Sequence, residues 1–133
     1  MQEVFIPTDR QIWEGEIATY WWEGAVLVSL SKSVKRTVPL IAGNVELVKS
    51  ITGNRPVPLL IYLKNSPMPD KATRQFSTEK LPEIYSAMAM VSKPGLSAFI
   101  MKLLFSLKPA PIPMKSFTDA AEARKWLTQF EKK

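Results

Sequence analysis

Residues 86–130 read SAMAMVSKPGLSAFIMKLLFSLKPAPIPMKSFTDAAEARKWLTQF, and this stretch decides the fold. It starts inside the apolar run Ile84–Val91, which is typical of a buried strand. The apolar residues of Leu96–Leu107 recur at helical spacing, and after a proline-rich connector Met114–Phe117 reads as a short strand before a final helix. Strand, helix, strand and helix in such close succession predict an α/β fold.

The helix predicted over Leu96–Leu107 is apolar on nearly every side. The spacing accounts for one buried face, and Lys102 is the one charged residue inside the run. A helix of this kind is buried deeply or covers a partner. We therefore predict an apolar contact surface that consists of Phe99, Met101, Leu104 and Phe105.

Helix-start signals mark the final helix. Asp119 followed three residues later by Glu122 resembles a capping box, and Thr118 is the alternative cap. The buried stripe of this helix is predicted to contain Ala123, Trp126, Leu127 and Phe130.

The upstream part of the chain supplies the other predicted elements. Residues 1–14 are expected to form a leading arm, or an edge strand through Val4–Ile6, ahead of a domain at 15–131. A turn signal between two runs of β-forming residues predicts a hairpin of Glu16–Trp22 and Ala25–Leu30. The remaining elements are a helix from Thr37 to Ile51, a buried strand at Val57–Leu63 and a short helix from Asp70 to Glu79.

The composition is that of a folded protein. A chain of 133 residues, 46% hydrophobic, is long enough for one core. The absence of cysteine fits a reducing compartment, and the N-terminus lacks the basic and apolar regions of a signal peptide. No apolar run is long enough to span a bilayer. We therefore expect a cytoplasmic protein.

The net charge of +6 raises the question of a nucleic-acid or membrane partner. The basic residues are scattered, with the nearest clusters at Lys32–Arg36 and 132–133, whereas a nucleic-acid footprint is clustered. The sequence therefore does not favour a nucleic-acid partner. The tryptophans Trp13, Trp21 and Trp22 are expected to pack on a sheet face, with a stacking platform for bases or sugars as the alternative.

The residue types that are missing exclude several chemistries. The chain contains no histidine and no cysteine, which excludes a Ser-His-Asp triad, a Cys-His pair and any histidine-bearing metal site. Its five glycines form no phosphate-binding loop. A carboxylate pair among Glu14, Glu16 and Glu23 stays open, but these acids are expected on a solvated hairpin. We predict no catalytic residue, cofactor or metal, and a protein that is not an enzyme.

The predicted order of elements resembles a STAS domain, the fold of anti-sigma-factor antagonists. Residues 86–130 are closer to the free-standing SpoIIAA-like proteins, in the strand Ala87–Val91, the helix Phe99–Phe105, the Pro111-x-Pro113 entry and the sequence Phe117-Thr118-Asp119. The resemblance implies a single-domain STAS-like α/β fold, with a mixed sheet of four or five strands and about four helices. It concerns fold more than activity, because these are core and capping residues.

In STAS antagonists a partner kinase phosphorylates a serine or threonine at the start of the helix after the central strand. Asp70 matches the aspartate of that motif, but the acceptor positions fall on Lys71 and Ala72, which have no hydroxyl. The resemblance therefore implies a phospho-regulated switch only through Thr73 or Ser66. The alternative is that Asp70 caps the helix and Thr73 is exposed to solvent.

The leading functional hypothesis is a non-enzymatic binding or regulatory module with a protein partner, and a second copy of the chain is one such partner. Free N–H groups at a helix start can bind, and apolar side chains exclude water from a contact. The predicted surface joins the apolar helix to a loop and helix start with Asn65, Ser66, Asp70, Thr73 and Arg74. One alternative is a carrier of a small apolar ligand, in a pocket between the sheet and helix 96–107. The other is the phospho-switch.

Overall fold

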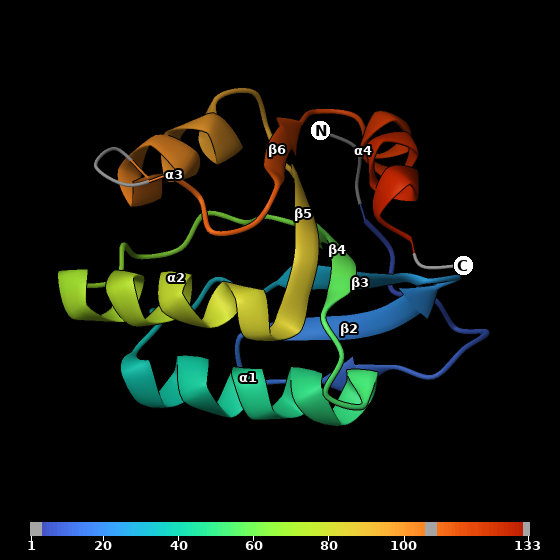
Figure 1. Cartoon of the computed structure of the whole chain (residues 1–133), viewed down its shortest axis with the longest axis horizontal. Helices are drawn as coiled ribbons and strands as arrows, with labels where there is room; N and C mark the ends of the chain where they lie inside the picture. The colour runs from blue at the N-terminus through green and yellow to red at the C-terminus, as the bar shows by residue number, and fades with distance from the viewer. Residues whose placement is uncertain (1–3, 106–108, 132–133) are drawn as a thin grey trace.

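A mixed sheet of six strands runs through the molecule in chain order (Figure 1). The structure, a computed structural model, describes residues 4–105 and 109–131, apart from the side chain of Leu104. The strands are β1 (Trp13–Glu14), β2 (Ala18–Glu23), β3 (Val26–Ser31), β4 (Val57–Tyr62), β5 (Tyr85–Val91) and β6 (Met114–Phe117). The helices are α1 (Val38–Thr52), α2 (Lys71–Ile84), α3 (Leu96–Phe105) and α4 (Ala120–Leu127), followed by a 3-10 turn at Thr128–Phe130.

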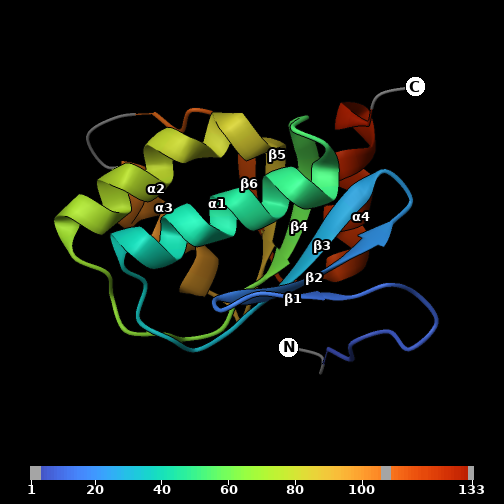
Figure 2. The same cartoon turned by 90° about the horizontal axis from the view of Figure 1, so that it is seen from below.

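The direction of the strands fixes where the helices lie. Strands β1, β2 and β3 pair antiparallel, whereas β3, β4, β5 and β6 pair parallel. Parallel neighbours need a crossover, and α1, α2 and α3 supply the three crossovers in turn. These three helices lie on one face of the sheet and α4 lies on the other (Figure 1, Figure 2).

Alternating side chains divide the core into two layers, as the two-residue period of a strand requires. Tyr20 and Leu27 belong to the layer under α1, α2 and α3, and their neighbours Trp21 and Val28 belong to the layer under α4. Trp21 is 1% exposed, so packing on a sheet face, and not a stacking platform, accounts for it. Both faces of the sheet are covered, which explains why the central strands are apolar almost throughout.

The helix starts follow the sequence closely. The Thr37 side chain accepts a hydrogen bond from the Leu40 N–H (3.3 Å), and Asp70 accepts one from the Thr73 N–H (2.8 Å). The start of α3 is capped from outside the helix, because Ser92, just after β5, accepts a hydrogen bond from the Ser97 N–H (3.0 Å). Asp119 caps α4 by accepting a hydrogen bond from the Ala121 N–H (3.0 Å). The helix starts expected at Thr37, Asp70 and Asp119 are confirmed, and the Ser92 cap is additional.

The edge of the sheet differs from the prediction. Strand β1 adds a sixth strand to the four or five expected, with Trp13 opposite Tyr20 and Glu14 opposite Thr19. Val4–Ile6, the predicted edge strand, lies outside the sheet. Val4 instead packs against the core layer under α4.

Helix α2 is longer than the helix expected to end at Glu79. It continues through Pro82 to Ile84, and the Tyr85 N–H bonds to the Leu81 carbonyl at its end. Proline normally ends a helix because it lacks an N–H group. Here Leu81 and Ile84 are both buried, and this burial favours the extra turn.

The apolar helix predicted to end at Leu107 is described as far as Phe105, and residues 106–107 lie outside the described residues. Within the described parts of the chain, no helix has the length and apolar character needed to cross a bilayer.

Candidate functional site

A cavity of about 370 Å³ lies between one face of the sheet and the helices α1, α2 and α3. Its walls are mainly apolar and come from every layer on this side of the molecule. The sheet contributes Leu59, Met88 and Met90, and α3 contributes Leu96, Ile100 and Leu103. The structure therefore contains a pocket where the sequence predicts one, between the sheet and helix 96–107.

The predicted loop and helix start form part of this cavity. Asn65, Ser66, Thr73 and Arg74 all line it, and the Arg74 guanidinium donates a hydrogen bond to the Pro69 carbonyl (2.7 Å). Asp70 stands beside the cavity as the cap of α2, and the bond from the Thr73 N–H lowers the pKa of its carboxyl. The structure thus brings together two segments that the sequence named separately.

The apolar residues of α3 divide between the cavity and the core. Phe99 lines the cavity while remaining 55% exposed, whereas Met101 and Phe105 pack against the core layer under α1 and α2. Leu104 belongs to α3, but its side chain lies outside the described part of the structure. The apolar excess of α3 therefore has two structural causes, a cavity wall and a core contact.

The two candidate hydroxyls differ in accessibility. Thr73, expected to be solvent exposed, is 2% exposed, because the first turn of α2 points it into the cavity wall. Ser66 lies in the exposed loop after β4. Of these two hydroxyls, only that of Ser66 is directly accessible to a kinase.

One wall of the cavity is polar, and we call Tyr20, Ser29, Asn44 and Tyr85 the polar wall. The Tyr20 hydroxyl donates to Asn44 Oδ1 (3.0 Å) and lies 3.5 Å from the Tyr85 hydroxyl. Burial raises the pKa of both tyrosines. Ser29 Oγ is buried without a hydrogen-bond partner in the described structure.

Arg36 is a cavity residue that sequence reasoning missed. Its guanidinium donates to the carbonyls of Lys32 (2.7 Å), Val34 (2.7 Å) and Ile17 (3.1 Å). Burial lowers its pKa. In the sequence it belongs to the short basic cluster Lys32–Arg36, which was interpreted only as surface charge; nothing there marks a residue that turns inward.

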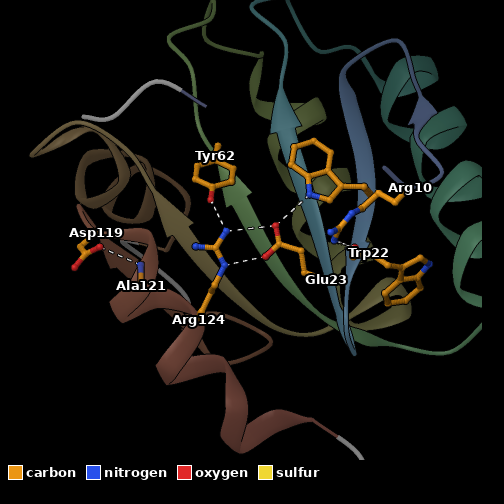
Figure 3. A network of polar contacts seen from close by, with 8 residues as sticks. Arg10, Trp22, Glu23, Tyr62, Asp119, Ala121 and Arg124 are labelled. Atoms are coloured by element: carbon orange, nitrogen blue, oxygen red, sulfur yellow. Dashed lines mark hydrogen bonds and ion pairs between the residues drawn. The ribbon is translucent and has the colours of Figure 1, made fainter. Parts of the chain in front are cut away.

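On the opposite face a polar network joins α4 to the hairpin (Figure 3). Arg124 contacts both carboxylate oxygens of Glu23 and donates to the Tyr62 hydroxyl (2.9 Å). A second cleft beside this network is lined by Phe5 and Asp119 among others. Because each charged group of the network already has a partner, we interpret it as structural.

The acids Glu14, Glu16 and Glu23 do not gather into one site. Glu14 pairs with Lys32 (3.0 Å) and Glu23 with Arg124 (2.8 Å). No group of three or more potential metal-ligating acids is found among the residues that the structure describes.

Comparisons with known proteins give a family and, from one solved structure, a fold. The family described as "Domain of unknown function (DUF7793)" matches residues 20–131. A solved structure of an uncharacterized DUF3478-family protein with a SpoIIAA-like fold, from Shewanella loihica PV-4, is 16% identical with a TM-score of 0.56. The alignment covers 96% of this chain and 98% of that chain. None of the curated proteins matches. The SpoIIAA-like α/β fold expected from the sequence is confirmed.

Proposed function

The chain belongs to the DUF7793 family of domains of unknown function, and from the site of this member we propose that it is a non-enzymatic binding module whose cavity takes a small, largely apolar molecule. The observation that carries the proposal is the cavity itself. Its volume of about 370 Å³ falls within the range of about 300–1,000 Å³ that is usual for ligand pockets.

The lining of the cavity matches such a ligand in chemistry as well as size. Ligand pockets combine mostly apolar walls with a few polar groups that orient the ligand. Here the apolar walls come from β4, β5 and α3, and the polar wall comes from β2, β3, α1 and β5. Filling an apolar cavity restores dispersion contacts that its lining otherwise lacks.

Two apolar side chains of the cavity lining are also exposed at the surface. Met68 and Phe99 are 51% and 55% exposed, and both line the cavity. Large exposed apolar residues at one place mark a binding site more often than scattered ones do. An apolar ligand that enters beside them covers part of their surface.

Binding of decanol to the full chain, followed by isothermal titration calorimetry, tests the proposal. Ile61 lines the cavity from β4, so Ile61→Phe should fill space and weaken binding by about tenfold or more. Leu30→Phe is the matched control, because Leu30 is a partly buried strand residue on the opposite face. Decanol that does not bind, or that binds equally to Ile61→Phe and the wild type, contradicts the proposal.

A protein partner is the second candidate, favoured by the exposure of Phe99 and Met68. The two functions are compatible, since a partner that binds at Phe99 contacts a residue of the cavity wall and can respond to a bound ligand. Pull-downs with the wild type and Phe99→Ser test this candidate. Partners retained equally by both proteins argue against docking at Phe99.

A further inference from the structure

Arg36 is a cation in the cavity wall with no anion beside it. Among the residues that the structure describes, Arg36 forms no ion pair, and all three of its hydrogen bonds go to neutral carbonyls. Arg36 is partly buried, and its three carbonyl hydrogen bonds offset only part of the cost of withdrawing a cation from water. A bound anion would offset the rest of that cost.

The charges around the cavity have one sign. Its charged lining residues are Arg36, Lys64, Arg74 and Lys80, and no acidic side chain of the described chain lines it. Lys80 is paired with Glu83 (3.1 Å), and Arg74 bonds to a backbone carbonyl. Walls of one sign attract ligands of the opposite sign.

Two serine side chains of β3 line the cavity near Arg36. Arg36 bonds to the Ile17 carbonyl, beside the pairing of Ala18 with Ser31 at the end of β3. Ser31 and Ser29 lie on the same face of β3, and both line the cavity while 3% and 1% exposed. Ser29 Oγ has no hydrogen-bond partner in the described structure, but it is almost wholly buried, so a ligand atom meets it only if neighbouring side chains move.

The far side of the cavity is apolar. Leu96, Ile100 and Leu103 of α3 face it together with Met88 and Met114. The cavity thus has a cationic, hydroxyl-bearing end and an apolar end, which is the pattern of an amphipathic ligand.

We propose that the ligand is an amphipathic carboxylate, whose carboxylate pairs with Arg36 and whose apolar tail lies against α3. The inference rests on the proposed function and specifies its ligand class. A carboxylate suits the site because the Arg36 guanidinium has no acidic partner in the described structure, and guanidinium binds carboxylate through directed N–H bonds.

Calorimetric titration of the full chain with decanoate, decanol and decylamine tests the ligand class at neutral pH. The three probes share one tail and differ in head-group charge. We expect decanoate to bind about tenfold or more tightly than decanol, as for a hydrogen bond to a charged group, and decylamine to bind most weakly.

Variants then test the assignment of Arg36. Arg36→Gln should abolish the preference for decanoate and leave the affinity for decanol unchanged, whereas Arg36→Lys should retain a preference. Arg74→Gln is the matched control, because Arg74 also lines the cavity but its guanidinium donates a hydrogen bond to the Pro69 carbonyl in the loop. If Arg36→Gln fails to fold, two measurements test the proposal instead: the ratio of decanoate to decanol affinity of the wild type, and the same ratio for Arg36→Lys.

The outcomes separate this inference from the proposed function. Equal binding of decanoate and decanol overturns the carboxylate and leaves the apolar-ligand function standing. A decanoate preference that survives Arg36→Gln overturns the role of Arg36. Binding of none of the probes overturns both proposals.

Discussion

The Arg124 guanidinium and the Glu23 carboxylate form a two-point ion pair although they stand 101 positions apart in the chain. Arg124 Nε lies 2.8 Å from Glu23 Oε1, and Nη2 lies 3.3 Å from Oε2 (Figure 3). The Trp21 indole N–H also donates to Glu23 Oε2 (3.2 Å). The pair therefore ties α4 to the end of β2 across the sheet.

Glu23→Gln should lower the free energy of unfolding at neutral pH by about 1 kcal/mol, because partial burial makes this pair stronger than a fully exposed one. Burial alone would raise the pKa of Glu23, but the hydrogen bonds from Arg124 and Trp21 outweigh it and lower the pKa. Urea denaturation of both proteins measures the difference.

The sign of the pH dependence follows from that lowered pKa. The stability due to Glu23 is complete above the ordinary glutamate pKa of about 4.3 and is lost as the pH falls below it, through the folded-state pKa. The wild type and Glu23→Gln should therefore converge in acid. Glu83→Gln, at an exposed pair with Lys49 and Lys80, is the control with a smaller loss. Curves that stay parallel in acid would contradict the prediction.

Two buried serines form a matched pair for a second prediction. Ser29 and Ser92 are each 1% exposed, but Ser29 Oγ has no partner, whereas Ser92 Oγ donates to the Lys93 carbonyl (2.9 Å) and accepts from the Ser97 N–H. Ser29→Ala should stabilise the protein by about 1 kcal/mol, because it removes an unsatisfied buried hydroxyl. Ser92→Ala should destabilise it by about 1–2 kcal/mol.

Thermal and urea unfolding of the two serine variants measure this contrast. The same substitution at equal burial leaves the hydrogen bonds as the main difference. A loss of stability in Ser29→Ala similar to that in Ser92→Ala would show that Ser29 has a partner after all.

Most elements of the fold could be predicted because their signals are local. The stripe of Ile41, Val45 and Val48 predicts α1, and all three side chains are buried in the structure. The end of α2 could not be predicted, because Pro82 is a local stop signal and the burial of Ile84 that outweighs it is a long-range contact. Strand β1 was missed for another reason, because two residues are too few to carry a periodic pattern.

The site was predictable in part. The apolar excess of Leu96–Leu107 and the segment from Asn65 to Arg74 both point to the cavity that they line. Arg36 and Ser29 were missed, because no spacing in the sequence distinguishes an inward-facing arginine or an unpartnered serine from ordinary ones. Such features depend on how β3, α1 and α3 come together.

Gly43 inside α1 and Gly53 just after its end should respond to alanine in opposite ways. Gly43 lies in the interior of α1 on its exposed face, and a Cβ there meets nothing within 4 Å. Gly43→Ala should therefore raise the free energy of unfolding by about 0.5–1 kcal/mol. Gly53 ends the helix with a φ of 68°, so Gly53→Ala should destabilise by about 1 kcal/mol although space is equally free. Urea denaturation of each variant measures the change. Changes of the same sign would contradict the backbone explanation.

The tyrosines of the polar wall should make the protein sensitive to alkali. Burial holds the pKa of Tyr85 above that of an unfolded tyrosine, about 10, so its stabilising effect is complete below that pH and is lost as the pH rises. Tyr85→Phe has no phenol to ionise. The stability of the wild type relative to Tyr85→Phe should therefore fall above about pH 10, by at most about 1.4 kcal/mol per pH unit. Tyr20→Phe should act in the same direction, because burial also raises the pKa of Tyr20. Urea denaturation between neutral and alkaline pH measures this difference, and a difference independent of pH would mean that the Tyr85 hydroxyl reaches water.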